Sequence, residues 1–286
     1  MRYIRDWDVR VKGPGPSGRR QRLQSGAMTS TPWDRAALVP SRSDNWPRPE
    51  VAALPADRLP ALDELFTFMR DAELRFTTLR MRIEERSGTS IGEHLVVSEL
   101  LLRHPGDARV TTSEEHRGTA GNYELWLSDG ETVRTYSAPH RLGTRRPVRH
   151  TVRGLDKDFP GRSRVYVPLT PLPMETLPDT FVHPAGYCQN VLSTGRCWVA
   201  GTDTVGSRPA VVIECETPRT IELTADRPDF RIKVAVDRAD GVILRLVETM
   251  GGRITRFAEA VDYAPDAPIP PSAFDFEFPE GTTMMF

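Results

Sequence analysis

The C-terminal third of the chain alternates apolar and polar residues in the manner of β-strands. Three phenylalanines alternate with two acids over residues 274–278, and residues 232–236 carry Ile or Val at every second position. Gly251 and Gly252 form a two-residue hairpin signal. A period of two puts successive side chains on opposite faces of a sheet, so each strand has one face for a core or a cavity. The pattern predicts a run of antiparallel hairpins, with the phenylalanines on an edge strand that closes the sheet.

One amphipathic helix and further strands precede this region. Leu62, Leu65, Phe66 and Met69 recur at i, i+3, i+4 and i+7 within residues 57–73, which is the spacing of one helix face. We expect this helix to pack over a sheet. Apolar runs predict strands at residues 75–85, 94–103, 108–113, 123–127, 131–136, 197–200 and 210–215. This order predicts an α+β fold in which an antiparallel sheet curls around a helix.

Residues 138–185 interrupt the strand pattern. The stretch lacks periodicity and contains several prolines, and irregular segments of this length are typical of lids or binding loops. It also holds an arginine cluster, which is suited to binding a phosphate, a carboxylate or an acidic protein face. The candidate residues are Arg141, Arg145, Arg146 and Arg149. A solvated loop in an arginine-rich chain explains the cluster equally well, and both interpretations stay open.

The balance of charge gives no reason to expect nucleic acid or an anionic membrane as a partner. The chain has 38 basic and 39 acidic residues and a formal net charge of -1. Arginine far outnumbers lysine, a composition that GC-rich, actinobacterial-type coding favours. No apolar run approaches the length of a transmembrane helix.

Residues 1–54 are basic and rich in proline, and we expect them to form a disordered leader before a single domain at residues 55–283. A secretory signal needs an apolar core of about 7–15 residues. Neither Met1 nor Met28, taken as the start, supplies such a core. The sequence therefore predicts a cytoplasmic protein, and which methionine begins the chain stays open.

No residue pattern indicates catalysis or a bound metal. The chain contains no HExxH, Walker or GxSxG sequence, and its six histidines are scattered. We therefore expect no cofactor, no metal and no catalytic residue. The three cysteines lack the spacing of zinc ligands. Cys188 and Cys197 could pair in an exported protein, whereas buried or free thiols are the simpler interpretation.

Four segments, in the same order along the chain, resemble a known superfamily. They are residues 125–139 with the turn Asp129-Gly130, residues 199–213 with Arg208-Pro209-Ala210, residues 236–245 with Asp237 and Asp240-Gly241, and residues 273–281. The first is similar to a hairpin of the LolA-like lipoprotein-carrier superfamily. The other three resemble the N-terminal domain of the periplasmic regulators of the sigma-E stress response (the MucB/RseB type).

This resemblance implies an incomplete β-barrel, in which a strongly curved antiparallel sheet is covered by helices around an apolar cavity. We expect a non-enzymatic binding protein that holds an acyl chain or a hydrophobic peptide segment there. The residues expected to face the cavity are Leu65, Phe66, Met69, Leu100, Trp126, Leu244 and Phe257. Plain core packing also explains Trp126. The alternatives are a cytoplasmic regulatory module that binds a partner protein of a sigma-factor pathway, and an enzyme that uses the cavity for its substrate.

Overall fold

The computed structural model describes residues 51, 53–89, 92–114, 121–149, 168–218 and 229–285. In these residues one sheet of twelve strands runs in the order β12-β6-β5-β4-β3-β2-β1-β11-β10-β9-β8-β7. Neighbouring strands are antiparallel, except that β12 pairs with β6 in parallel. β7 and β12 lie at opposite ends of this order, so the sheet is open rather than closed into a barrel.

The strands form two meanders that meet where β1 pairs with β11. The first comprises β1 (Thr78–Thr89), β2 (Gly92–Arg103), β3 (Asp107–Glu114), β4 (Glu124–Asp129), β5 (Thr132–Ser137) and β6 (Leu142–Pro147). The second comprises β7 (Arg196–Val205), β8 (Arg208–Glu216), β9 (Arg231–Asp237), β10 (Ile243–Met250) and β11 (Arg253–Pro265), while β12 (Thr283–Met285) follows a C-terminal segment.

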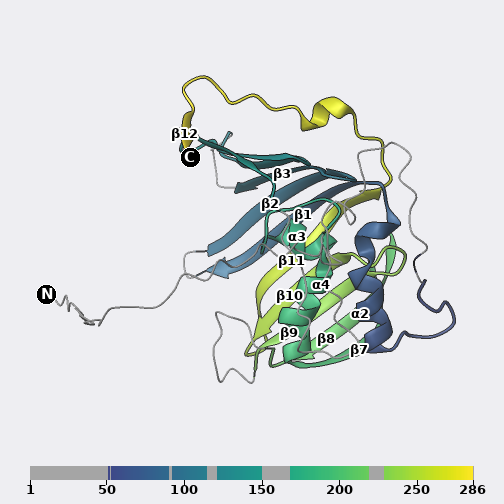
Figure 1. Cartoon of the computed structure of the whole chain (residues 1–286). Helices are drawn as coiled ribbons and strands as arrows, with labels where there is room; N and C mark the ends of the chain where they lie inside the picture. The colour runs from purple at the N-terminus through teal and green to yellow at the C-terminus, as the bar shows by residue number, and fades with distance from the viewer. Residues whose placement is uncertain are drawn as a thin grey trace, which may run out of the picture.

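Helices cover one face of the second meander (Figure 1). The α-helices are α2 (Leu62–Arg70), α3 (Leu177–Val182) and α4 (Pro184–Asn190), and the short 3-10 helices are η1 (Ala72–Arg75), η2 (Leu192–Thr194) and η3 (Pro271–Phe274). α2 packs against α4 and β7, and α3 packs against β10 and β2. This confirms the expected α+β fold, an open, curved antiparallel sheet with helices on one face.

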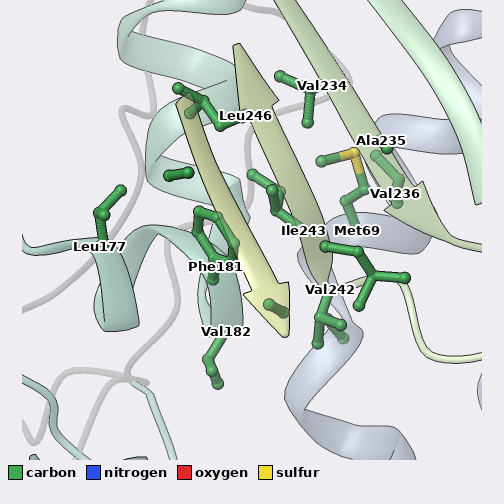
Figure 2. Packing of buried hydrophobic residues seen from close by; sticks show 14 of the residues in the cluster. Met69, Leu177, Phe181, Val182, Val234, Ala235, Val236, Val242, Ile243 and Leu246 are labelled. Atoms are coloured by element: carbon green, nitrogen blue, oxygen red, sulfur yellow. The ribbon is translucent and has the colours of Figure 1, made fainter. Parts of the chain in front are cut away.

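The main core lies between these helices and the sheet. Figure 2 shows Met69 of α2 and Phe181 of α3 among strand side chains that include Ile243 and Leu246. All four side chains are fully buried. Each fully buried side chain of this kind contributes about 1.5–3 kcal/mol, so burial of their apolar faces explains why α2 and α3 lie against the sheet.

A second, smaller core lies on the other side of the first meander. Leu125, Leu127 and Tyr136 are buried there and are covered by Phe276 and Phe278. The Tyr136 ring centroid lies 5.7 Å from that of Phe276 and 6.4 Å from that of Phe278. The C-terminal segment that carries these rings crosses the sheet before it ends in β12 (Figure 1).

The expectation that residues 274–278 form a closing edge strand is wrong. Phe274 ends η3, and residues 275–279 have no regular secondary structure. The two following rings instead pack on the second core, and β12 is the strand at that end of the sheet. Gly143 of β6 makes room for this packing, because an added Cβ would lie 2.7 Å from the Phe278 ring.

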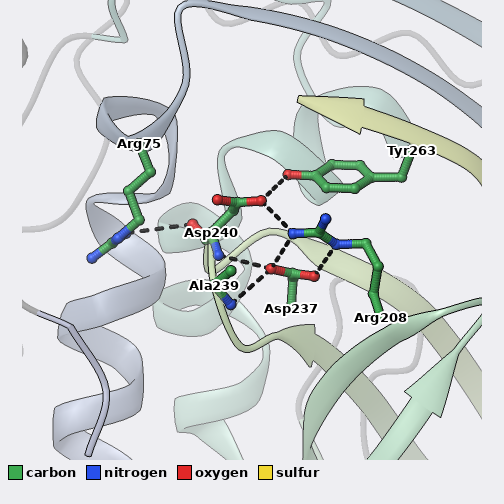
Figure 3. A network of polar contacts seen from close by, with 6 residues as sticks. All are labelled: Arg75, Arg208, Asp237, Ala239, Asp240 and Tyr263. Carbon is green, nitrogen blue, oxygen red and sulfur yellow. Dashed lines mark hydrogen bonds and ion pairs between the residues drawn. The ribbon is translucent and has the colours of Figure 1, made fainter. Parts of the chain in front are cut away.

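Two of the motifs that carried the family resemblance meet in one polar network (Figure 3). Arg208 donates from Nε to Asp237 at 2.5 Å and from Nη2 to Asp240 at 2.6 Å, and the Tyr263 hydroxyl donates to Asp240 at 3.0 Å. Asp237 is 1% exposed. Burial, together with the charge of Asp237, raises the pKa of Asp240. The network fixes the turn between β9 and β10 against β8 and β11.

The same turn touches the helical layer. Gly241 has φ +80°, and an added Cβ would lie 3.0 Å from both the carbonyl oxygen and the ring of Phe68. Arg75 donates to the Phe68 carbonyl at 2.7 Å, and its guanidinium lies 3.7 Å from the centre of the Phe68 ring. Glycine is required here because the backbone is left-handed and the neighbouring helix end is close.

Several boundaries differ from those expected. The helix predicted over residues 57–73 is shorter, and the segment predicted to be irregular, 138–185, contains β6, α3 and the start of α4. Residues 1–50, which make up most of the predicted leader, lie outside the described residues, as do residues 150–167 of the predicted insertion.

Candidate functional site

A cavity of about 210 Å³ opens between α2, α4, η2 and β7. Its apolar wall comprises Leu62, Phe66, Ala185, Cys188 and Cys197, and polar side chains that include Thr67 and Ser193 complete the lining. Leu62 and Phe66 belong to the apolar stripe of α2 but are only half-buried. The cavity therefore exists because α2 turns part of its apolar face toward a gap rather than toward the sheet.

Of the seven residues expected to face a cavity, Phe66 alone lines this one. Leu65, Met69, Leu100 and Leu244 are 0–1% exposed and belong to the packed core. The expectation of a cavity beneath α2 is therefore wrong for these four residues, because their side chains fill the space between helix and sheet.

The other two predicted residues lie on the first meander and on β11. Trp126 is half-buried and packs against the main core, on the opposite face of β4 from Leu125 and Leu127, so the core-packing interpretation fits it. The prediction that Phe257 faces the cavity is wrong. It lies on the opposite face of β11 from Ala258, whose side chain joins the main core.

The predicted arginine cluster does not converge on one point. Arg145 and Arg146 are consecutive residues of β6, so their side chains point to opposite faces of the sheet. Arg141 lies in the turn before β6 and Arg149 beyond its end, and all four side chains are exposed. The loop interpretation is wrong for Arg145 and Arg146, since strand pairing with β5 holds them.

A larger groove, of about 640 Å³, lies on the face of β1, β2, β3 and β11 that points away from the helices. Its arginines already have partners. Arg80 lies 3.2 Å from Asp262, Arg82 lies 3.4 Å from Glu99, and Arg109 donates to a backbone carbonyl of η3 at 3.1 Å. The groove therefore holds three arginines that each have a partner, two of them carboxylates, rather than a set of arginines that converge on an anion.

A buried histidine joins the end of the α2–η1 segment to α3. His183 Nδ1 lies 3.0 Å from Asp179 and Nε2 lies 3.2 Å from Glu73, and the side chain is 1% exposed. Burial alone would lower its pKa, but the two carboxylates raise the pKa of His183 to about 9. None of the three residues lines the 210 Å³ cavity. A charged imidazole sealed between two acids suits a structural role rather than proton transfer to a substrate.

The three cysteines are free thiols and gather near the cavity. Cys188 Sγ lies 3.8 Å from the Met69 sulfur, whereas Cys197 and Cys215 both approach the Leu192 carbonyl, at 2.8 and 3.3 Å. The sequence left open a Cys188–Cys197 disulfide or free thiols, and it placed neither cysteine at a site. The register that brings Cys215 beside Cys197 comes from pairing of β7 with β8.

Within the described ranges, no group of three or more His, Cys, Asp or Glu side chains is placed to hold a metal ion. No helix in that part of the chain is long and apolar enough to span a membrane.

The open sheet with helices on one face is the class of fold that the four motifs predicted. Neither protein-family models nor curated proteins give a match to the chain. Similar solved structures do include the superfamily that the motifs indicated. MucB is 14% identical with a TM-score of 0.44, and the match covers 75% of this chain and 62% of MucB.

A second structure is the Pseudomonas aeruginosa MucA/MucB complex, at 15% identity and a TM-score of 0.44, covering 75% of this chain and 60% of that one. A LolA superfamily protein from Nitrosomonas europaea is 8% identical with a TM-score of 0.31, covering 76% of this chain and 99% of that one. The chain thus spans about three fifths of the MucB chains.

Proposed function

We propose that the chain is a non-enzymatic binding protein that holds a hydrophobic group in the cavity between α2, α4 and β7. The observation that carries the proposal is the cavity itself, with an apolar wall that includes Phe66 and polar side chains such as Thr67 in its lining. Small-molecule sites in proteins commonly combine an apolar lining with a few polar groups. The buried polar groups around His183 are sealed away from this cavity, which supports binding rather than catalysis.

The size of the cavity limits what it holds. At about 210 Å³ it lies below the roughly 300–1,000 Å³ of pockets that bury a drug-sized ligand. It therefore suits the end of an acyl chain or one apolar side chain of a partner. Burial of about five methylenes contributes about 4 kcal/mol, which corresponds to a Kd of about 1 mM. Useful affinity then requires contacts outside the cavity, as an acylated protein or a regulatory partner protein would make.

Two variants test the cavity. Thr67 is exposed on α2 and belongs to the cavity lining, so Thr67→Phe should put a ring across the opening. Thr202 is an exposed residue of β7 that does not line the cavity, and Thr202→Phe is the matched control. Binding of a fluorescent medium-chain fatty acid should weaken about tenfold in Thr67→Phe, the equivalent of about two lost methylenes. Equal binding by both variants would refute the proposal, and no binding by the original chain would exclude an acyl chain as the hydrophobic group.

A second pair of measurements shows whether the hydrophobic group is an acyl chain or an apolar side chain of a partner protein. Organic extraction of the purified protein followed by mass spectrometry detects a bound lipid. Cross-linking in cells, with Thr67→Phe as the negative control, detects a protein whose recovery depends on the open cavity. Recovery of a protein without extractable lipid would favour the regulatory module, whereas lipid with no cavity-dependent protein would favour a carrier.

A further inference from the structure

Cys197 and Cys215 face each other across two neighbouring strands. They are directly paired in the antiparallel register of β7 and β8. Opposed residues in such a pair have Cα atoms about 4.5–5.5 Å apart, inside the roughly 4.4–6.8 Å range of disulfides. Both sulfur atoms point to the helix side, where they lie 2.8 and 3.3 Å from the same Leu192 carbonyl oxygen. The backbone therefore already has the spacing that a bond between these sulfurs requires.

The two thiols differ in how they can be reached. Cys197 is half-buried and lines the cavity, whereas Cys215 is 1% exposed and lies behind it. Gly195 leaves room for the inner thiol, because an added Cβ would lie 2.7 Å from Cys215 Sγ. A small reagent that enters the cavity therefore meets Cys197 first. The hydrogen bond between the two thiols lowers the pKa of Cys215 and raises the pKa of Cys197, so the Cys215 thiolate is placed to accept the Cys197 proton when Cys197 reacts.

The third cysteine, Cys188, is not paired across two strands with another cysteine. Cys188 lies on α4 and also lines the cavity, but it is only 3% exposed and its sulfur contacts Met69 Sδ at 3.8 Å. Burial raises the pKa of the Cys188 thiol, and a buried, protonated thiol reacts slowly. Cys188 therefore serves as an internal reference that should stay reduced in the folded protein.

We infer that Cys197 and Cys215 are a reversible oxidation site that forms a cross-strand disulfide when hydrogen peroxide enters the cavity. The Cys197 sulfur attacks the peroxide, the O–O bond breaks, and a sulfenic acid and water form. Cys215 then attacks the Cys197 sulfur, the S–O bond breaks, and the hydroxyl group leaves as a second water. Two thiols are oxidised and one hydrogen peroxide is reduced. A dithiol reductant restores both thiols by exchange.

Oxidation would also change the wall of the cavity. In the reduced state both thiols are placed to donate to the Leu192 carbonyl, which also accepts from the Gly195 amide at 3.1 Å. A disulfide has no S–H, so both thiol contacts are lost and η2 is held less firmly against the sheet. The inference does not depend on the proposed binding function, because the bond forms without any ligand.

Peptide mapping of the full, reduced chain tests the inference. The protein is treated with about one equivalent of hydrogen peroxide, its remaining thiols are blocked with N-ethylmaleimide, and the unreduced digest is examined by mass spectrometry. The expected result is one linked pair, Cys197–Cys215, with N-ethylmaleimide on Cys188, and loss of the link after dithiothreitol. A link through Cys188, N-ethylmaleimide on all three cysteines, or Cys197 found only as the sulfinic acid would each overturn the inference.

Variants and a denatured sample provide the controls. Cys188→Ala should keep the link, and Cys197→Ala should abolish it while circular dichroism confirms the fold. In urea the preference for the Cys197–Cys215 pair should disappear, because the strand register no longer selects the partners. A preference that persists in urea would show that the fold does not create the site, and would also overturn the inference.

Discussion

Replacement of Arg208 by methionine tests whether the network in Figure 3 holds the β9–β10 turn in place. The Arg208 side chain is 27% exposed, and it forms ion pairs with Asp237, 1% exposed, and Asp240, 13% exposed. Methionine keeps much of the side-chain volume but removes the charge. Asp237 would then be a buried carboxylate without a cationic partner from this network, which is unfavourable because the charge cannot be hydrated.

The expected loss follows from what remains around Asp237. Breaking a buried ion pair costs about 3–5 kcal/mol. Asp237 keeps the backbone amides of Ala239 and Asp240 as donors, at 2.8 and 2.7 Å, and Arg208 is partly hydrated. We therefore expect a loss at the lower end of this 3–5 kcal/mol range, about 3 kcal/mol in the free energy of unfolding. For a chain of this size Tm should fall by about 6–12 °C, measured by far-UV circular dichroism.

Arg231→Met is the matched control. Arg231 is 64% exposed and lies 3.1 Å from Glu216, and surface pairs of this kind contribute about 0–1 kcal/mol. Equal losses for Arg208→Met and Arg231→Met would refute the reasoning. Asp237→Asn in the Arg208→Met background should restore part of the stability, because it removes the uncompensated charge. If the double variant is no more stable than Arg208→Met, the loss comes instead from the packing of the Arg208 guanidinium on the Tyr263 ring, whose centre lies 4.7 Å away.

Three further changes have defined outcomes. His183 has a pKa of about 9 in the folded chain against 6.5 for the free side chain, so the stability that its protonation contributes is complete below pH 6.5 and is lost as pH rises through 9. Urea titrations should show that the free energy of unfolding falls by roughly 3 kcal/mol over this interval. His183→Gln should remove that fall. Gly241→Ala should lower stability by at least about 1–2 kcal/mol, because its left-handed backbone disfavours a Cβ that would also meet Phe68; an unchanged Tm would contradict this. Gly143→Val should displace the Phe278 ring and speed limited proteolysis of the C-terminal segment, and an unaltered cleavage rate would show that the ring packing is unimportant.

The strands with clear alternation were predictable because their signal is local. Residues 232–236 alternate and correspond to β9, Arg231–Asp237. By contrast, Leu142–Pro147 has no alternation, and its strand conformation depends on pairing with β5 and β12. Tertiary pairing of this kind overrides weak local preference. The helices α3 and α4 span six and seven residues, too short to show a periodic pattern.

The candidate site was less predictable than the fold. The α2 face was visible in the sequence, but whether its members fill the core or line a gap depends on where α4 lies. Leu65 and Met69 are buried, while Phe66 of the same stripe lines the cavity. The motifs Arg208-Pro209 and Asp237 to Gly241 indicated the fold through turn chemistry. Their contact in one network needed the strand order, because Arg208 and Asp237 are 29 residues apart.

The C-terminal segment over the second core has a consequence for how the chain folds. Arg134 of β5 donates to the Phe276 carbonyl at 3.0 Å across 142 residues, and Arg109 of β3 donates to the Ala273 carbonyl across 164 residues. Closing loops of this length costs chain entropy before the contact contributes anything, and proteins dominated by such contacts fold slowly. We expect Leu125 and Leu127 to be exposed during that delay, so folding at high protein concentration should favour aggregation through the first meander.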